Sequence, residues 1–376
     1  MKIAINTRLL LKDRLDGIGW FTYESLKRIT QEHPEHQFQF IFDRPYAEEF
    51  IFSENIEPIV IGPPTRHPIL YYLYFEWRLP ALLKKIQPDL FLSTDGYLSL
   101  RNPYPSLAVI HDINFHHFPQ DLPWAYNKYY NYYFPRFAQK AKRIATVSNY
   151  SKEDIAKAYN IPLSKIDVVY NGVNERYTPT SPTQQTQTRQ KYTNGKPYFL
   201  FVGTLLARKN IARLLEGFDH FKEQQESDVQ LLIVGNKKWW TDKMEQAFQA
   251  MKHPSSVQFL SYIQPADLQN IMGAALAKTF VPIFEGFGIP IVEAMQCELP
   301  VLTSDASATK EIAQDACLLV DPYDTEAIAA GMSRLHNEPQ LRHQLIEKGK
   351  KRVQDFSWDL TAKRLWNSIE KTIHTK

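Results

Sequence analysis

The chain has 376 residues, of which 44% are hydrophobic and 23% are charged, and its formal net charge at pH 7 is +3. This composition is ordinary for a folded globular protein of about two domains, and it excludes wholesale disorder. The nearly balanced charge argues against a nucleic-acid binder, so any anion site must be local. The only cysteines, Cys297 and Cys317, are too few for a disulfide framework or a four-cysteine metal site, and they fit a reducing cytoplasm.

The N-terminal segment predicts a first strand rather than a signal peptide, because Asn6 and Arg8 interrupt its apolar residues. No stretch approaches the roughly 18 consecutive apolar residues of a membrane-spanning helix. We therefore expect a cytoplasmic protein whose only membrane contact would be peripheral, at the inner face.

Short β-rich runs alternate with helix-length segments along both halves of the chain. This alternation predicts two doubly wound, parallel α/β sheets of the Rossmann-like type, each covered by helices. A polar segment at 178–189 lacks apolar periodicity and predicts a surface connector, with the domain boundary inside 174–197. The predicted strands are 2–6, 38–42, 58–61, 89–93, 107–110, 143–147 and 167–170 in the first half, and 198–202, 230–234, 257–260, 277–281, 300–303 and 317–320 in the second.

The most informative motif joins Glu285 to Glu293 through a glycine-rich turn. Pro290 suits the first position of a helix, so we predict a helix from about Pro290, with Glu285 on the preceding loop and Glu293 one turn inside. Gly286 and Gly288 let the backbone approach a bulky ligand, and N–H groups at a helix start bind anions. The segment predicts a sugar-phosphate cradle in which both carboxylates face one ligand.

A pair of cations, Arg208 and Lys209, lies between the predicted strand 198–202 and a helical pattern at 211–221. Isolated, such a pair would indicate only a solvated surface. At the end of a strand in a doubly wound domain, it can neutralise the charge that develops on a phosphate leaving group.

These motifs resemble the retaining nucleotide-sugar glycosyltransferases of the GT-B architecture, in the large family 4, whose Glu-x7-Glu motif is matched by Glu285 and Glu293. The resemblance runs from Gly17 to about Trp358. It implies two Rossmann-like domains that face each other across a cleft. The acceptor-side domain would be 1–173 plus 358–376, with a returning C-terminal helix over 360–373, and the donor-binding domain 174–357.

The resemblance also implies roles for individual residues. Arg208 and Lys209 would neutralise the departing diphosphate, Glu285 would hold the sugar hydroxyls and Glu293 the ribose hydroxyls. His111 matches the family histidine that contacts the transferred sugar near C6, so the catalytic set is His111, Arg208, Lys209 and Glu285. The donor-binding set is Gly17, Gly19, Gly203, Thr204, Gly286, Phe287, Gly288, Ile289 and Glu293.

Gly17 and Gly19 also suggest a dinucleotide-binding fingerprint, but ten residues separate them from the first strand and Thr22 takes the third glycine position. The family instead has a flexible glycine loop here that closes over the ligand. Trp20 adds bulk at this point, and Thr204 stands where some relatives have a basic residue. The acceptor-side candidates are Trp20, Asp112 and Ser148.

Two local features have structural interpretations. Ser151 is the expected N-cap of a helix that follows the strand 143–147. Asn171 and Gly172 tolerate left-handed geometry and predict a hinge turn. The aromatic tracts 71–77 and 126–134 are expected to be mostly core, although aromatic rings beside cations also suit a peripheral contact with an anionic membrane.

The predicted function is transfer of a hexose, with mannose from GDP-mannose favoured, to a glycan or lipid-linked acceptor in surface polysaccharide synthesis. No cofactor, metal or nucleic acid is expected. The alternatives are a UDP-sugar transferase for glucose or N-acetylglucosamine, a GT-B epimerase or phosphorylase, and a non-catalytic glycan-binding protein. The Glu-x7-Glu spacing argues against the epimerase, and the intact charged cluster argues against the glycan-binding protein.

Overall fold

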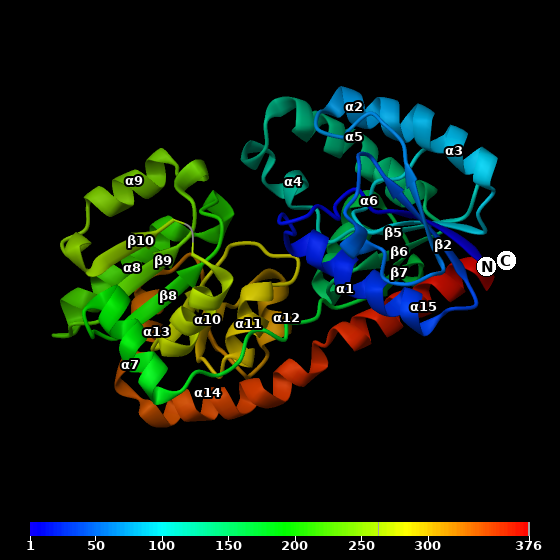
Figure 1. Cartoon of the computed structure of the whole chain (residues 1–376). Helices are drawn as coiled ribbons and strands as arrows, with labels where there is room; N and C mark the ends of the chain where they lie inside the picture. The colour runs from blue at the N-terminus through cyan, green and yellow to red at the C-terminus, as the bar shows by residue number, and fades with distance from the viewer. Residues whose placement is uncertain (262, 375–376) are drawn as a thin grey trace. The chain divides into compact units, whose positions relative to one another are not determined.

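The computed structural model describes residues 1–261 and 263–374, and the chain divides into two compact units (Figure 1). Unit 1 comprises Met1–Gly172 and Ser357–Lys376, and unit 2 comprises Val173–Phe356. The predicted limits, 1–173 with 358–376 and 174–357, differ from these by one residue. Which unit takes the donor and which the acceptor is not decided by this division and stays a prediction.

A seven-stranded parallel sheet forms the centre of unit 1, in the order β3-β2-β1-β4-β5-β6-β7. All seven predicted strands of the first half are present, with ends within two residues of the prediction. They are β1 (Lys2–Asn6), β2 (Gln37–Phe42), β3 (Ile56–Val60), β4 (Leu90–Ser93), β5 (Ser106–Val109), β6 (Arg143–Thr146) and β7 (Ile166–Val168).

Successive residues of a strand belong to two different hydrophobic clusters, one on each face of the sheet. Both faces are therefore covered. Leu90 and Leu92 of β4 pack with residues of α1 and α15, whereas Phe91 belongs to the cluster that contains the rings of η2 and α5. This alternation explains why the strands read as continuous apolar runs. The helices of unit 1 are α1 (Gly17–Glu32), α2 (Pro68–Leu73), the π-helical turn η2 (Tyr74–Arg78), α3 (Leu79–Ile86), α4 (Asn114–His117), α5 (Trp124–Lys140), α6 (Asn149–Tyr159) and α15 (Trp358–His374).

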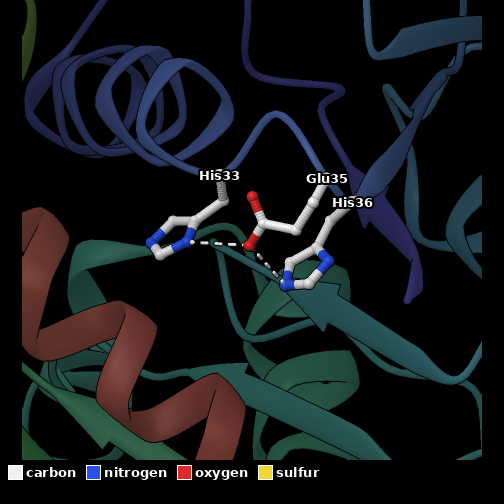
Figure 2. A group of neighbouring side chains, drawn as sticks. All are labelled: His33, Glu35 and His36. Carbon is white, nitrogen blue, oxygen red and sulfur yellow. Dashed lines mark ion pairs between the residues drawn. The ribbon is translucent and has the colours of Figure 1, made fainter.

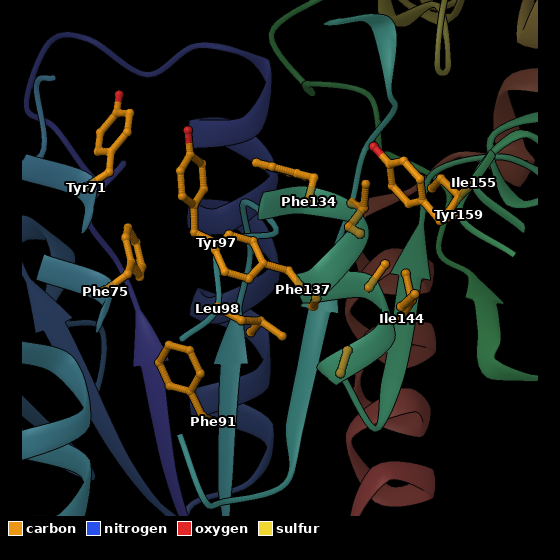
Figure 3. Close-up of a cluster of buried hydrophobic side chains, with 14 of the residues drawn as sticks. Tyr71, Phe75, Phe91, Tyr97, Leu98, Phe134, Phe137, Ile144, Ile155 and Tyr159 are labelled. Carbon is orange, nitrogen blue, oxygen red and sulfur yellow. The ribbon is translucent and has the colours of Figure 1, made fainter. Parts of the chain in front are cut away.

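Eight of the eleven rings in the two aromatic tracts belong to the hydrophobic core, five of them buried and three half-buried, so the tracts are mostly core, as predicted. Figure 3 shows Tyr71 and Phe75 from the first tract and Phe134 from the second, packed around Tyr97. The ring centroids of Tyr97 and Phe134 are 5.1 Å apart, in an edge-to-face contact. Such pairs add to the stabilisation from burial alone. Within the described residues, no helix is long and apolar enough to cross a membrane.

The last helix, α15, belongs to unit 1 and packs against α1, in agreement with the predicted return of a helix over 360–373. Trp358 at its start lies against Gly172, where an added Cβ would come within 2.5 Å of the Trp358 ring. The predicted left-handed turn at Asn171 and Gly172 is wrong, since neither is among the positive-φ residues of the described chain. Glycine is required here for close approach rather than for an unusual φ.

Unit 2 holds a six-stranded parallel sheet in the order β10-β9-β8-β11-β12-β13. All six predicted strands of the second half are present, with ends within one residue. The strands are β8 (Tyr198–Val202), β9 (Gln230–Val234), β10 (Val257–Leu260), β11 (Ala277–Phe280), β12 (Val301–Ser304) and β13 (Leu318–Val320). The helices are α7 (Pro182–Thr193), α8 (Ile211–Gln224), α9 (Asp242–Gln249), α10 (Pro265–Ala274), α11 (Ile289–Gln296), α12 (Ser307–Ala313), α13 (Thr325–Asn337) and α14 (Pro339–Arg352).

The predicted surface connector at 178–189 is largely the helix α7, so that prediction is wrong. Ser181 and Gln184 form a capping box, with Pro182 in the first turn. These start signals outweigh the missing apolar periodicity. The helix packs on α10, and Arg189 Nε donates to the Ala274 carbonyl at 2.8 Å. Tertiary contacts rather than an apolar face hold it in place.

Both sheets reverse their strand order beside the first strand of their unit. In unit 1 the reversal places β4 next to β1, and in unit 2 it places β11 next to β8. Open α/β sheets bind ligands beyond the carboxyl ends of the strands at such a switch point. The segments that follow these four strands are therefore the first places to look for a site.

Candidate active site

Two loops at the switch point of unit 2 bring the predicted motif residues together. One follows β8 and carries Arg208, and the other follows β11 and carries Glu285. The backbone N–H of Ile283 donates to the Arg208 carbonyl at 2.8 Å, which ties the loops to each other. Residues separated by more than 70 positions in the sequence thus become neighbours because β8 and β11 pair.

Arg208 and Lys209 both contact the carboxylate of Glu285. Arg208 Nη1 lies 3.3 Å from Glu285 Oε1, and Lys209 Nζ forms a second ion pair with the same oxygen. The three side chains keep 14%, 13% and 11% exposure, respectively, so they are shielded from bulk water but not sealed. Two positive charges facing one negative charge give this cluster the means to hold an anion.

Asn210 fixes the loop that carries the cations, and sequence reasoning missed it. Its backbone is left-handed, with φ of 65°, and its buried side chain donates to the Val281 carbonyl at 3.0 Å and the Pro322 carbonyl at 2.6 Å. Asparagine tolerates this geometry better than most residues. The signal was available, since an Asn directly after the cations precedes the helical pattern of α8.

The loop before α11 is held at both ends. Glu285 N donates to Ser307 Oγ at 3.1 Å, and Ala308 N donates to the Glu285 carbonyl at 3.3 Å. Helix α11 begins at Ile289, one residue before the predicted start, and its cap Gly288 has φ of 102°, a value that other residues rarely adopt. The phenyl ring of Phe287 is buried and packs edge-on against Phe356 at 5.5 Å, so it supports the loop from inside.

The remaining predicted donor residues of unit 2 lie in the loops that follow β8 and β11. Gly286 is buried in the same loop, Gly203 follows β8 directly, and Thr204 is exposed. Their contact with a donor is not tested by the structure and stays a prediction.

Glu293 has a different set of neighbours from Glu285. Burial raises the pKa of Glu293, and the nearby Lys278 and Arg176 oppose this shift. Lys278 lies inside β11, and burial lowers its pKa to about 8. Within the described chain its Nζ has no hydrogen-bond partner. Because the two glutamates have separate partners, the idea that both face one ligand stays a prediction.

His111 follows β5 in unit 1 and is held as a neutral ring. Burial lowers its pKa, although the Thr94 carbonyl and Asp112 oppose the shift. Nε2 lies 2.9 Å from the Thr94 carbonyl, which can only accept, so this nitrogen carries the proton and Nδ1 is left as an acceptor. The ring packs edge-on against Phe21 at 4.9 Å. This state suits contact with a sugar hydroxyl better than proton donation.

The glycines near the N-terminus lie in a helix rather than in a loop. Asp16 caps α1, whose first residue is Gly17, and Asp16 Oδ1 accepts from Gly19 N at 2.8 Å. The predicted flexible loop over Gly17 and Gly19 is therefore wrong, because capping draws both residues into the first turn. Trp20 lies in the same turn, edge-on to Tyr23 at 5.7 Å. Its contact with an acceptor stays a prediction.

The other two acceptor-side candidates each satisfy a local backbone group. Asp112 Oδ1 accepts from Asn114 N at 2.9 Å. Ser148 Oγ accepts from Ser151 N at 3.0 Å, so Ser148 is the N-cap of α6 and the prediction of Ser151 is wrong. Ser148 has the extended backbone that a cap needs, whereas Ser151 is already helical. Direct roles for both residues with the acceptor stay predictions.

Two protein-family models match the chain along most of its length. The model described as Glycosyltransferase Family 4 matches residues 16–177, and the model described as Glycosyl transferases group 1 matches residues 184–352. The chain belongs to the family 4 glycosyltransferases. The second match includes Arg208, Lys209, Glu285 and Glu293.

Named relatives of this glycosyltransferase include two bacterial enzymes. O-antigen chain mannosyltransferase B of Escherichia coli is 26% identical over 96% of this chain and 97% of its own length. O-antigen chain mannosyltransferase RfbU of Salmonella typhimurium is 27% identical over 78% of this chain and 79% of its own. The structure of HepE from Anabaena in complex with UDP and glucose matches with a TM-score of 0.74 over 99% of this chain and 100% of that one, at 17% identity. The fold is GT-B.

A group of potential metal ligands lies on unit 1 at the turn between α1 and β2 (Figure 2). Among the described residues, His33, Glu35 and His36 place ligand atoms within 4.8 Å of one another. Glu35 Oε1 is 3.6 Å from His33 Nδ1 and 3.2 Å from His36 Nε2, and both imidazoles stack on Trp366 of α15. These contacts join the turn to α15, which gives this group of the glycosyltransferase a structural explanation. The expectation that no metal takes part in transfer stays a prediction.

Proposed function

We propose that the chain transfers a mannosyl residue from GDP-mannose to a glycan or lipid-linked acceptor in surface polysaccharide or glycoconjugate synthesis, with retention of the anomeric configuration. The observation that carries the proposal is the cluster of Arg208, Lys209 and Glu285 at the switch point of unit 2. Mannose is supported by the relatives named as O-antigen mannosyltransferases, one of which aligns along almost the whole chain.

The cations act on the leaving group. As the bond between the sugar and the diphosphate breaks, negative charge grows on the phosphate, and Arg208 and Lys209 neutralise it where it develops. The N-terminus of α11 adds the positive end of a helix dipole. Before the donor binds, Glu285 holds both cations in place, so little reorganisation is needed when the phosphate arrives.

Retention follows without a nucleophile from the protein. The departing phosphate oxygen accepts the proton of the acceptor hydroxyl, which attacks from the face that the phosphate leaves. Glu285 accepts hydrogen bonds from the sugar hydroxyls and Glu293 from those of the ribose, because a carboxylate pairs well with two adjacent hydroxyl donors. His111, neutral and with Nδ1 free to accept, receives a hydroxyl of the transferred sugar near C6.

Two alternatives keep the fold but change the outcome. HepE, which was crystallised with UDP and glucose, supports a UDP-sugar donor as the second candidate. A glycan-binding protein without transferase activity is the candidate of another class, and the preserved charge cluster argues against it. Neither alternative, nor the GDP-mannose proposal, involves a metal or other cofactor.

Thermal stabilisation by nucleotides separates these candidates. The full chain is heated alone and with GDP, UDP, ADP, CMP or NAD at one common concentration. A nucleotide that is then at about 100 times its dissociation constant adds roughly 2.7 kcal/mol. Stabilisation by GDP that is lost in Arg208→Ala/Lys209→Ala supports the proposal. Stabilisation by UDP moves it to the UDP-sugar alternative, and NAD alone contradicts transfer from a nucleotide sugar.

A peripheral membrane contact fits the exposed side of the aromatic tracts. Trp77 of the first tract keeps 53% exposure and Tyr132 of the second keeps 52%, while Trp124, just before the second tract, keeps 72%. Each of these rings has a cation over its face, at 4.0 Å for Trp77, 4.5 Å for Trp124 and 3.7 Å for Tyr132. Exposed aromatic rings beside cations are typical of protein surfaces that bind the membrane interface.

The charge of these elements favours an anionic membrane as the partner. Helix α5 carries three cations and no acidic residue. The segment Pro68–Ile86 carries three cations and one acid, Glu76, which is buried and accepts from Leu100 N at 3.0 Å. We therefore include in the proposal that α2, η2 and α5 rest on an acidic bilayer, where a lipid-linked acceptor would be found.

A further inference from the structure

A buried arginine occupies the switch point of the sheet in unit 1. Arg8 comes just after β1 and Asp95 just after β4, and these two strands are the pair at which the strand order reverses. Arg8 Nε donates to Asp95 Oδ2 at 2.6 Å. Asp95 Oδ1 in turn accepts from Asn6 Nδ2 at 2.8 Å and from Ser93 Oγ at 2.9 Å. The same position in unit 2 holds the Arg208 and Glu285 cluster.

The guanidinium is anchored through only some of its donors. Besides the bond to Asp95, Arg8 Nη1 donates to Thr65 Oγ1 at 3.2 Å, and Thr65 Oγ1 donates to Asp43 Oδ2 at 2.6 Å. Arginine has five N–H donors. Asp95, Thr65 and the nearby Tyr71 hydroxyl engage at most three of them, while the side chain keeps 9% exposure. An oriented donor therefore remains for a ligand.

Burial disfavours the charged form of Arg8, but the neighbouring groups stabilise that form. Desolvation alone would lower the pKa of Arg8, and the carboxylate of Asp95 raises it above its ordinary value. The ring of Tyr97 lies 4.3 Å from the guanidinium carbon, and that of Tyr71 lies 5.4 Å from it. The guanidinium thus stays charged, and the two buried rings hold it in a fixed orientation.

The hydroxyl groups of Tyr71 and Tyr97 point toward the same side, and Figure 3 shows the two rings side by side. Nearby, the Tyr74 hydroxyl is buried without a hydrogen-bond partner among the described residues, and Asp43, Arg8 and Asp95 act on it electrostatically. An enclosed hydroxyl without a partner costs stability, so the cluster is not optimised for folding alone.

The charges of the cluster balance. Asp95 is paired with Arg8, and Asp43 is paired with Arg44, whose Nε lies 2.6 Å from Asp43 Oδ1. A phosphate would bring more negative charge with no unpaired cation in the cluster to match it. A neutral ligand that offers hydroxyl groups to Arg8 and to the tyrosine hydroxyls has no such cost.

We propose that Arg8 and the hydroxyl groups of Tyr71 and Tyr97 form the subsite for a neutral sugar residue at the end of the acceptor. Arg8 donates through a remaining N–H to a ring hydroxyl of that sugar, and Asp95 is the positioning residue that fixes the guanidinium. This inference rests on the proposed function, since it names the acceptor class of the same reaction. It assigns acceptor recognition to residues that the motifs of the sequence did not include.

Binding without turnover tests the subsite separately from the proposed function. Saturation-transfer NMR is recorded on the full chain with the methyl glycosides of α-mannose, β-glucose and β-galactose, and with mannose 6-phosphate as the anionic arm. We expect at least one neutral glycoside to bind. Arg8→Lys should weaken that binding at least tenfold, and Tyr71→Phe at least threefold. Arg143→Lys is the matched control, because Arg143 pairs with Asp167 by two hydrogen bonds at the other end of β6.

The outcomes are distinguishable. Absence of binding by every neutral glycoside, preference for the phosphorylated sugar, or wild-type binding in both folded variants would overturn the subsite. Tyr71→Phe removes only one oxygen, so it keeps the test valid if Arg8→Lys does not fold, which circular dichroism reports. GDP-induced stabilisation is measured on the same samples and should be unchanged in these variants. Its absence in the wild type would contradict the proposed donor without touching the acceptor subsite.

Discussion

Removing both cations from the cluster of Arg208, Lys209 and Glu285 should reduce the rate of sugar transfer by orders of magnitude. In Arg208→Ala/Lys209→Ala, the diphosphate loses two charged hydrogen-bond donors that converge within contact distance of one carboxylate oxygen. A hydrogen bond to a charged group contributes about 1.5–3 kcal/mol. Two of them amount to about 3–6 kcal/mol, which corresponds to a loss of roughly 10²- to 10⁴-fold in kcat/KM for the donor.

The assay is release of nucleoside diphosphate at varied donor concentration, with product confirmed by mass spectrometry. The side chains keep 13–14% exposure, so solvent screens them little, and the loss should persist at 0.5 M salt. The matched control is Lys350→Ala/Lys351→Ala, an adjacent pair of exposed cations on α14 that should leave kcat/KM within about twofold. A folded Arg208→Ala/Lys209→Ala variant whose kcat/KM stays within threefold of wild type would refute the role of the cations.

Three further predictions concern stability and surface binding. Burial lowers the pKa of Lys278 to about 8, so above that pH the unfolded chain binds more protons than the folded chain. The free energy of unfolding should therefore rise by up to about 1.4 kcal/mol per pH unit between about pH 8 and 9.5. Denaturant unfolding should show this rise in wild type and not in Lys278→Met. Gly172→Ala should lose about 1–3 kcal/mol in calorimetry, because its Cβ would meet the Trp358 ring at 2.5 Å, and an unchanged melting temperature would contradict that close approach. Trp77→Ser/Trp124→Ser should bind vesicles with 30% anionic lipid several-fold more weakly in flotation, and equal binding by the variant and wild type would argue against the proposed membrane surface.

The strands were predictable because buried parallel strands leave continuous apolar runs of limited length, whereas their order in each sheet was not predicted and is known only from the structure. The start of α11 was predictable to one residue, because Pro290 restricts the backbone on both of its sides. The cap of α6 was displaced by one turn, since Ser148 and Ser151 are both good capping residues and only the backbone conformation distinguishes them. Helix α7 was missed because it has no apolar stripe along its surface. Its start signals, the capping box and Pro182, were visible in the sequence but were not used.

The sequence motifs and their loop positions predicted that Arg208, Lys209 and Glu285 belong to the site. They did not predict which charge pairs with which. Glu285 pairs with cations that lie more than 70 residues away, and the pairing depends on β8 and β11 being neighbours. Lys278 reads in sequence as an ordinary strand residue, and its burial near Glu293 is decided by the packing of α11 on β11. Arg8 gave no signal either, because its partner Asp95 is 87 positions away.

NMR of the product is the decisive test of mannose transfer from GDP-mannose with retention. The full chain is incubated with GDP-mannose and the neutral glycoside that binds best, and the new anomeric signal is assigned by its one-bond carbon–proton coupling. We expect release of GDP together with an α-linked product, which has the configuration of the donor, and loss of both in Arg208→Ala/Lys209→Ala. A β-linked product, or transfer that the double variant leaves unchanged, would contradict it.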